Sequence, residues 1–214
     1  MGRENKKEAV AALHRERIMQ TAEAMFLEKG FLQTTLEDIS QKSEYSRRTI
    51  YAYFESKEDI LHHIIAKGLC SLKQDIENDL QSSTDFAETY FAICRSMKRY
   101  QTQCPHSLEN IMNAKTGDMD LTRPSPAVER IFSLGTEVNG LLADFIAKGR
   151  EQGIVRQAVS PMQTVFILWS SITSLLTLVK TKGQYISKAF SVPEEDFLEY
   201  GFTQIINSIL EVRI

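Results

Sequence analysis

Two adjacent arginines, Arg47 and Arg48, begin a short segment whose side chains suit the recognition of nucleic acid. The planar guanidinium group of arginine can donate two parallel hydrogen bonds to O6 and N7 of guanine in the DNA major groove. Tyr51 and Tyr53 follow, and a phenol hydroxyl can donate to a backbone phosphate while its ring covers the protein surface. The segment therefore indicates an exposed helix that reads base edges and contacts phosphates.

Helical geometry predicts which of these side chains face outward. At about 100° per residue, an inward-facing Ile50 leaves Phe54 about 40° away, so we expect both to pack against the preceding helices. Arg47 then lies on the flank at the start of the helix, near base edges if the N-terminal half of the helix enters the groove. The residues that point away from the core are Arg48, Thr49, Tyr51 and Ala52.

The helix starts around this segment supply three further candidate residues for the DNA-binding site. Lys57 lies in the first turn of the following helix, where a cation opposes the helix dipole and a bound phosphate would offset that conflict. Thr35, at the start of the preceding helix, could donate its hydroxyl to phosphate in the same way. Ser46 is expected to cap the arginine-bearing helix by accepting a backbone hydrogen bond.

Short helices separated by tight breaks must position these side chains. The stretch Thr34-Thr35-Leu36-Glu37 has the capping-box pattern, with glutamate three residues after a threonine cap, and so predicts a helix start. A second helix is expected from Ser46, and Ser56 should cap a third. Two short helices joined by about three or four residues form a helix-turn-helix, whose second helix can enter the major groove.

The rest of the chain shows helical spacing without sustained two-residue alternation, which predicts an all-α protein. Residues 1–60 should contain a charged N-terminal arm (1–12) and a three-helix helix-turn-helix domain. Residues 61–214 should form a larger helical domain for ligand sensing and dimerisation, linked to the first by a helix over about 57–80. Further helices are expected over 13–29, 127–152 and 161–183, after Asp85, and from Pro193 onward.

Charge, cysteine content and hydropathy limit what kind of protein this is. The net charge is −3, and residues 1–60 hold ten Lys and Arg against eleven Asp and Glu, so any nucleic-acid affinity must come from the placement of cations. The three cysteines form no paired motif, which favours a reducing, cytoplasmic location. Residues 162–179 are uncharged over a membrane-spanning length but rich in hydroxyl groups, so a buried helix is preferred over a membrane span.

No pattern indicates catalysis or a bound cofactor. The chain has neither a glycine-rich phosphate loop nor a nucleophile elbow. Cys104-Pro105-His106 lacks a second cluster of ligands, so an incidental thiol is favoured over a metal site or an oxidation sensor. We therefore expect no metal, no cofactor and no enzymatic activity.

Two C-terminal stretches carry apolar residues at alternating spacings of three and four, which favours helices packed about 20° apart. This spacing fits a hairpin within one chain, or two hairpins that form a four-helix interface in a homodimer; the second interpretation is preferred. The expected interface residues are Val165, Leu168, Ile172, Leu175, Val179, Leu198, Phe202, Ile205 and Ile209, with Val212 continuing the spacing.

A ligand pocket would lie among the helices after residue 57. Its apolar lining could come from Tyr90, Phe91, Met97, Met112, Phe132, Phe166 and Trp169, with polar contacts from Ser170 or Thr173. Few charges fall on these helical faces, so the expected ligand is largely apolar or aromatic. The alternative is that these side chains simply fill a core, because apolar residues at helical spacing need no ligand.

Residues 13–65 resemble the DNA-binding domain of the TetR/AcrR family of transcriptional regulators. The resemblance rests on Phe26-Leu27-Glu28-Lys29-Gly30-Phe31, Thr34-Thr35, Glu37-Asp38-Ile39, Ser46, Thr49-Ile50-Tyr51-Ala52-Tyr53-Phe54 and Ser56-Lys57-Glu58. It implies a homodimeric repressor that binds a palindromic operator on double-stranded DNA and is released by a small-molecule effector. It also implies DNA-contacting positions at Thr35, Arg47, Arg48, Thr49, Tyr51, Tyr53 and Lys57.

The chain departs from the family pattern at the turn, where Ser43-Glu44-Tyr45 replaces a frequent Ala-Gly-Val. Without the glycine, Glu44 must adopt a positive φ or the turn must change. Arg48 replaces a frequent small residue, so the operator cannot be inferred from relatives. Two alternatives stay open: an architectural DNA-binding protein without a ligand, and an all-α enzyme or carrier.

Overall fold

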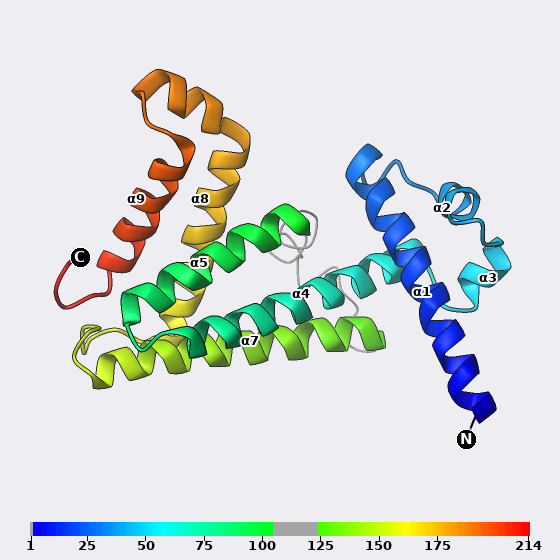
Figure 1. The fold of residues 1–214 in the computed structure, drawn as a ribbon, viewed down its shortest axis with the longest axis horizontal. Coiled ribbons are helices and arrows are strands. Elements are labelled where there is room, and N and C mark those ends of the chain that lie inside the picture. Colours follow the sequence, from blue (N-terminus) through cyan, green and yellow to red (C-terminus); the bar gives the residue numbers. More distant parts are fainter. Residues whose placement is uncertain (1, 105–123) are drawn as a thin grey trace. The chain divides into compact units, whose positions relative to one another are not determined.

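The computed structural model describes residues 2–104 and 124–214, with side chains from Lys6 onward. The all-α prediction is confirmed: the described residues form helices joined by short connections, with one isolated antiparallel bridge between Val155 and Leu210. Figure 1 shows the helices, which are α1 (Gly2–Lys29), α2 (Leu36–Ser43), α3 (Arg47–Tyr51), α4 (Lys57–Ser82), α5 (Phe86–Gln103), α7 (Pro126–Glu151), α8 (Pro161–Phe190) and α9 (Glu194–Asn207).

The chain divides into two compact units. The first contains the described residues up to Leu69, together with Cys104 and the described residues from 124 to Phe132. The second contains residues 70–103 and 133–214, so the helices α4 and α7 each contribute to both units. The functional boundary near residue 60 that the sequence suggested stays a prediction.

In the first unit, α1 to α3 pack around a small apolar core. Its fully buried side chains come from all three helices and the residues just after α3: Ile18, Ala22, Phe26, Ile39, Ile50 and Phe54. Gly30 ends α1 in the left-handed region at φ +88°, as its position suggested. The charged arm predicted over residues 1–12 was wrong, because α1 already begins at Gly2. Lysine, glutamate and alanine dominate this stretch and are strong helix formers.

The caps of the short helices lie close to where the sequence placed them. The capping box is shifted by one residue: Thr35, not Thr34, caps α2, and Asp38, not Glu37, returns the hydrogen bond. Ser46 caps α3 through its side chain, and the Ser56 hydroxyl accepts from the Asp59 amide at 3.1 Å, so both of these predictions are confirmed. Glu44 adopts a positive φ of 62°, which was the first of the two options for the turn.

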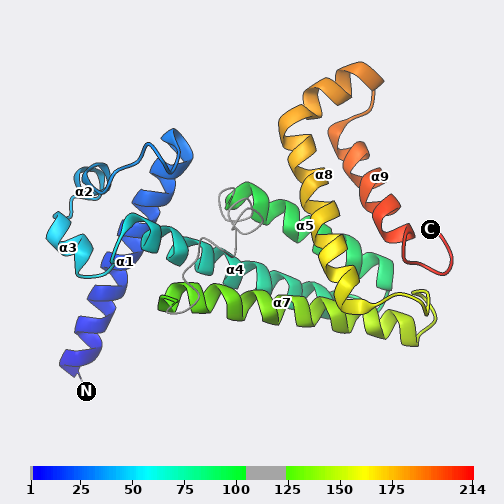
Figure 2. The same ribbon diagram turned by 180° about the vertical axis from the view of Figure 1, so that it is seen from behind.

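In the second unit, α8 and α9 run side by side in opposite directions, which both views show (Figures 1 and 2). Helix α5 packs against both of them. The unit's largest fully buried side chains come from α4, α5, α7 and α9: Leu72, Ile76, Met97, Leu134, Val138, Ile146 and Ile206. Gly153, at φ +73°, ends α7 as expected.

Helix α8 was predicted to end at Gly183, but it continues to Phe190 and ends at Ser191 with φ +55°. Gly183 lies inside the helix. A β-carbon at this position would lie 2.6 Å from the Glu194 carboxyl carbon, so the lack of a side chain leaves room for Glu194. Figure 1 shows α8 changing direction in its last turns, drawn in orange. The glycine therefore permits a close approach and a bend rather than a stop.

By length and composition α8 could also cross a membrane, since the mean hydropathy of its most apolar window is 1.6. Core helices of soluble proteins often share this property. The sequence predicted a buried helix here, but only 22% of the window is buried in this structure. One face of α8 packs within its unit, and the other carries exposed apolar side chains.

Candidate DNA-binding interface

Helix α3 presents polar side chains to solvent and apolar ones to the core. Ile50 and Phe54 are 1% and 2% exposed, which confirms the orientation worked out from the sequence. Arg47, Arg48 and Tyr51 are exposed. The helix has only five residues, and its geometry is fixed at the start by Ser46, whose hydroxyl accepts from the Thr49 amide at 3.1 Å. The Thr49 hydroxyl lies 2.9 Å from the same oxygen.

The two arginines differ in their surroundings. Arg47 forms an ion pair across the helix-turn-helix with Glu37 of α2, although its side chain remains 59% exposed. Arg48 has no hydrogen-bond or ion-pair partner among the described residues. Arg48 is therefore the freer of the two guanidinium groups, and Arg47 is held from the side by a carboxylate.

Tyr53 faces α1 as well as solvent. Its hydroxyl lies 3.0 Å from Nδ1 of His14, and the Arg15 guanidinium carbon lies 5.7 Å from the centre of its ring. Tyr51 is 57% exposed and extends from the recognition helix itself. Of the two phenols, Tyr51 is thus the one whose hydroxyl is not already bonded to a described residue.

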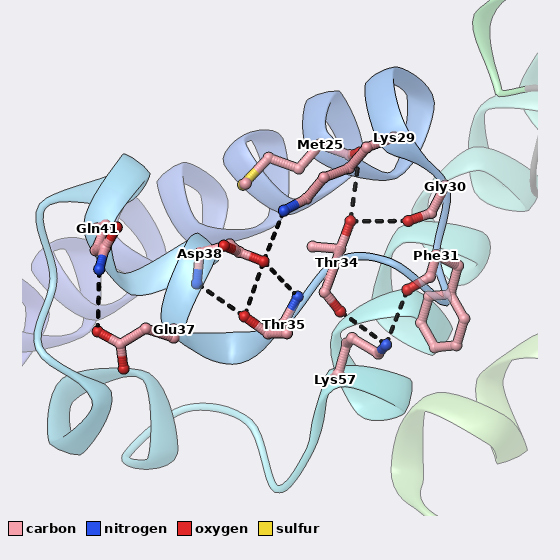
Figure 3. A network of polar contacts seen from close by, with 10 residues as sticks. All are labelled: Met25, Lys29, Gly30, Phe31, Thr34, Thr35, Glu37, Asp38, Gln41 and Lys57. Carbon is pink, nitrogen blue, oxygen red and sulfur yellow. Dashed lines mark hydrogen bonds and ion pairs between the residues drawn. The ribbon is translucent and has the colours of Figure 1, made fainter.

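Lys57 connects the start of α4 to the loop between α1 and α2, as Figure 3 shows. Its ammonium group donates to the carbonyl oxygens of Phe31 and Thr34, each at 2.8 Å, and lies 4.2 Å from the centre of the Phe31 ring. The backbone carbonyls offset the unfavourable position of a cation at a helix N-terminus. Lys57 thus already has partners within the protein, and its contact with a phosphate stays a prediction.

Thr35 uses its polar groups to start α2. Its amide and hydroxyl both donate to Asp38 at 2.8 Å, and the same carboxylate oxygen accepts from Lys29 at 2.6 Å (Figure 3). The Lys29 ammonium and the Thr35 hydrogen bonds lower the pKa of Asp38 from 3.8 to about 2. The Thr35 hydroxyl proton is thus already bonded within the protein.

Several cations of this unit are paired with acids. Besides the Lys29 and Arg47 pairs, Arg17 pairs with Glu44 at 2.9 Å, and Lys67 pairs with Glu16. Such exposed pairs contribute little to stability, roughly 0–1 kcal/mol each. Their effect on function is larger, because paired acids cancel the attraction that each cation would otherwise exert on phosphates.

The second unit contains a small apolar cavity of about 30 Å³. Tyr90, Met97 and Trp169, which were all predicted to line a pocket, are among its walls, together with Ile93, Leu142, Phe145, Ile146, Val165, Leu168 and Ile172. This volume holds one or two water molecules and no organic effector. The Tyr90 hydroxyl donates to the Phe202 carbonyl at 3.0 Å, and the Trp169 indole donates to Asn139 at 3.1 Å.

The other predicted pocket residues do not line this cavity. Phe91 is partly exposed, Phe132 and Phe166 are 41% and 57% exposed, and Ser170 is exposed. Thr173 is buried, and its hydroxyl has no hydrogen-bond partner in the part of the chain that the structure describes. Met112 and His106 lie outside the described residues. Among the described residues, no three His, Cys, Asp or Glu side chains are placed to hold a metal ion.

The predicted dimer seam is mostly internal to one chain. Val165, Ile172, Val179, Leu198, Phe202 and Ile209 are buried by contacts within the chain, so they cannot also face a second copy. Leu168, Leu175 and Ile205 are partly exposed, and Val212 is 78% exposed. The spacing therefore describes the intrachain hairpin of α8 and α9, which the sequence left as its second option.

A different face of α8 carries exposed apolar side chains. Ile167, Leu178 and Tyr185 are 62%, 38% and 68% exposed, and their spacings of 11 and 7 residues place them within about 20° of one another on a helix. The buried residues lie on the opposite side of the helix. Tyr200 of α9 is 65% exposed.

Sequence reasoning missed Glu37, Gln41 and His14 as parts of the site. Glu37 bonds both Gln41 and Arg47, and His14 bonds Tyr53. The signal for Gln41 was its position four residues after Glu37 on one helix. The contacts with Arg47 and Tyr53 join residues far apart in the sequence, and no local pattern indicates them.

Comparisons with known proteins agree with this geometry. Residues 18–64 match the family model described as bacterial regulatory proteins, tetR family. The chain is 24% identical over 166 residues to the uncharacterized HTH-type transcriptional regulator YhgD of Bacillus subtilis, covering 74% of this chain and 80% of YhgD. It is 43% identical over 60 residues to the HTH-type transcriptional repressor BepR of Brucella suis, but this match spans only 28% of this chain and 29% of BepR.

The similarity in fold extends further than the similarity in sequence. A transcriptional regulator of the TetR/AcrR family from Thermobifida fusca superposes with a TM-score of 0.69 at 20% identity, covering 90% of this chain and 96% of that one. At this identity the superposition shows the fold alone. Residues 18–64 therefore form a DNA-binding domain of the tetR family, in a chain that shares the fold of a TetR/AcrR transcriptional regulator over 90% of its length.

Proposed function

We propose that the protein is a homodimeric repressor that binds a palindromic operator and is released by a small, largely apolar or aromatic effector. The observation that carries the DNA-binding part is the outward face of α3, where Arg47, Arg48 and Tyr51 are exposed above a buried Ile50. A short helix that is held rigidly and projects arginines can read guanine in the major groove.

The exposed residues divide into two roles. Arg48 and Arg47 read base edges, and Tyr51 and Thr49 contact the phosphate backbone. Thr35, Ser46, Tyr53 and Lys57 support the interface: each bonds within the protein and fixes a helix start or the packing of α1. Where one of these four residues also contacts a phosphate, it does so through hydrogen-bond donors that are not engaged within the protein.

The dimer forms through the exposed face of α8 that carries Ile167, Leu178 and Tyr185. Large apolar side chains exposed at regular helical spacing favour packing against a second helix, and a two-fold axis would bring the same face of two copies together. Each half of a palindrome would then be read by one α3, with half-sites about 34–36 Å apart per helical turn of DNA.

An effector that binds at the apolar cavity would require the helices around that cavity to move apart. The cavity among α5, α7 and α8 is apolar but holds only one or two water molecules, so an effector must displace the surrounding side chains. A ligand that binds the opened form more tightly shifts the population toward it, and release from DNA follows if that form separates the recognition helices.

The DNA-binding part is tested by selecting binding sites from random DNA with the full chain. The wild type should enrich a palindrome, and Arg48→Ala should relax the preference at one base pair of each half-site, because loss of the guanidinium should cost about 1–3 kcal/mol there. Equal base preference of the two proteins at every position would contradict base reading by Arg48. Small molecules are then screened for release of the selected site.

The dimer is tested by sedimentation. Ile167→Asp should convert the wild-type dimer to a monomer, because the charge would face the partner's apolar surface. Leu32→Asp is the matched control, since Leu32 is a large apolar residue of the first unit that is 86% exposed. A wild-type monomer at micromolar concentration, or a dimeric Ile167→Asp variant, would contradict the proposed interface.

One observation favours a second function, that of a DNA-binding protein without an effector. The apolar cavity among α5, α7 and α8 is only about 30 Å³ and holds no organic effector in this form. An operator complex that no apolar or aromatic compound releases would support this alternative.

A further inference from the structure

The carboxylate of Glu37 is held between two helices. It lies in the first turn of α2, where a negative charge is favoured by the helix dipole. Its Oε1 accepts from the side-chain amide of Gln41 at 3.3 Å, which Figure 3 shows, and its Oε2 pairs with Arg47 of α3. The carboxylate is thus fixed on one side by its own helix and bonds an arginine of the recognition helix on the other.

The pair leaves Arg47 able to bind DNA. A guanidinium group has five N–H donors in a planar fork, and the ion pair with Glu37 engages one terminal nitrogen. The Arg47 side chain is 59% exposed, so its remaining donors are accessible to a ligand. Contact with Glu37 restricts the directions in which a long, flexible side chain can point, and this lowers the entropy lost when it binds a base.

The same carboxylate opposes indiscriminate binding. Glu37 is 47% exposed and carries a negative charge beside the recognition helix, where DNA phosphates would approach. An arginine without such a neighbour can reach either a phosphate or a base edge, whereas the carboxylate repels the phosphate and leaves the guanine edge as the favourable partner. Repulsion of the wrong contact is a general source of specificity.

We propose that Glu37 is a positioning residue that directs Arg47 toward a base edge, so that it sets sequence specificity without itself touching a base. This inference rests on the proposed function, because it requires that α3 reads DNA. It assigns a role in selectivity to an acid that would otherwise only weaken DNA binding.

The test compares Glu37→Gln with Glu44→Gln in the full-length dimer. Glu44 is the matched control, because it is also an exposed acid of this unit paired with an arginine, Arg17, that is not on α3. Both variants lose one negative charge, but only Glu37→Gln loosens Arg47. Affinities are measured for the selected operator, for operators with each base pair changed, and for random DNA at several salt concentrations.

We expect Glu37→Gln to lower discrimination at one base pair of each half-site by about three- to tenfold, a fraction of what a bidentate arginine–guanine contact provides. Its affinity for random DNA should rise. Glu44→Gln should leave base discrimination unchanged. In an Arg47→Ala background, Glu37→Gln should no longer alter base preference, because no guanidinium remains for it to position.

Two results would overturn the inference: equal discrimination by the Glu37→Gln variant and the wild type, or the same effect of Glu37→Gln in the Arg47→Ala background. If Glu37→Gln does not fold, Gln41→Leu tests the same point, since it removes the second bond to the carboxylate and should shift discrimination in the same direction. A wild-type protein that selects no sequence would instead overturn the proposed function.

Discussion

Replacing Lys57 with methionine separates a structural role for this lysine from a role in phosphate binding. Methionine keeps an unbranched apolar stem of similar length but removes the ammonium group that donates to the carbonyls of Phe31 and Thr34. If those bonds hold the loop between α1 and α2 against the start of α4, the variant should be less stable even when no DNA is present.

The magnitude follows from the two hydrogen bonds. Each bond to a charged donor contributes about 1.5–3 kcal/mol when fully protected. Lys57 is partly exposed, so water can replace part of the loss, and the released side chain regains up to about 2 kcal/mol of conformational entropy. A net loss of roughly 1–3 kcal/mol is therefore expected, which corresponds to a fall in Tm of about 2–10 °C for a chain of this size.

Thermal unfolding followed by circular dichroism measures this loss, with Lys42→Met as the control. Lys42 is an exposed cation of α2 that bonds no other described residue, so its removal changes the charge without breaking such a contact. The reasoning would be refuted if Lys57→Met melted at the wild-type temperature while its DNA affinity fell. In that case the slope of log affinity against log salt concentration should also become shallower by about one. That combination is the signature of a phosphate ligand.

Three further predictions concern other parts of the structure. Gly149→Ala should destabilise the protein by about 1–3 kcal/mol in urea unfolding, because its β-carbon would lie 2.5 Å from the Phe86 ring, whereas Gly140→Ala has open space and should stabilise by up to about 1 kcal/mol. Tyr90→Phe should lower stability by about 1–3 kcal/mol, since a buried carbonyl loses its donor, but leave operator affinity unchanged if its role is structural. Because partners lower the pKa of Asp38 from 3.8 to about 2, its charge stabilises the fold above about pH 4, and this contribution is lost as pH falls toward 2. Asp38→Asn should therefore flatten the pH dependence of unfolding in that window, and an unchanged profile would refute the assignment.

Local signals accounted for most of the first unit. The cap at Ser46, the positive φ of Gly30 and the inward orientation of Ile50 each depend on residues within one or two turns of helix. Such features can be predicted because the interacting groups are neighbours in the sequence. The capping box was misplaced by one residue because Thr34 and Thr35 are both followed, three residues later, by an acid.

Contacts between distant residues could not be predicted in this way. Lys57 contacts carbonyls that lie 23 and 26 residues earlier, and no local pattern indicated these partners. Gly183 suggested a helix end, although its lack of a side chain instead accommodates Glu194 from the next helix. The apolar spacing on α8 indicated a packed helix without indicating the partner, because both of its faces carry large apolar residues.

The chain contains one tryptophan, and Trp169 lies in the wall of the apolar cavity with its indole bonded to Asn139. Its fluorescence therefore reports on the surroundings of that cavity without any label or added DNA. A compound that entered the second unit would displace the indole or change the polarity around it and so shift the emission, whereas a compound that acted only on the DNA-binding unit would leave the spectrum unaltered.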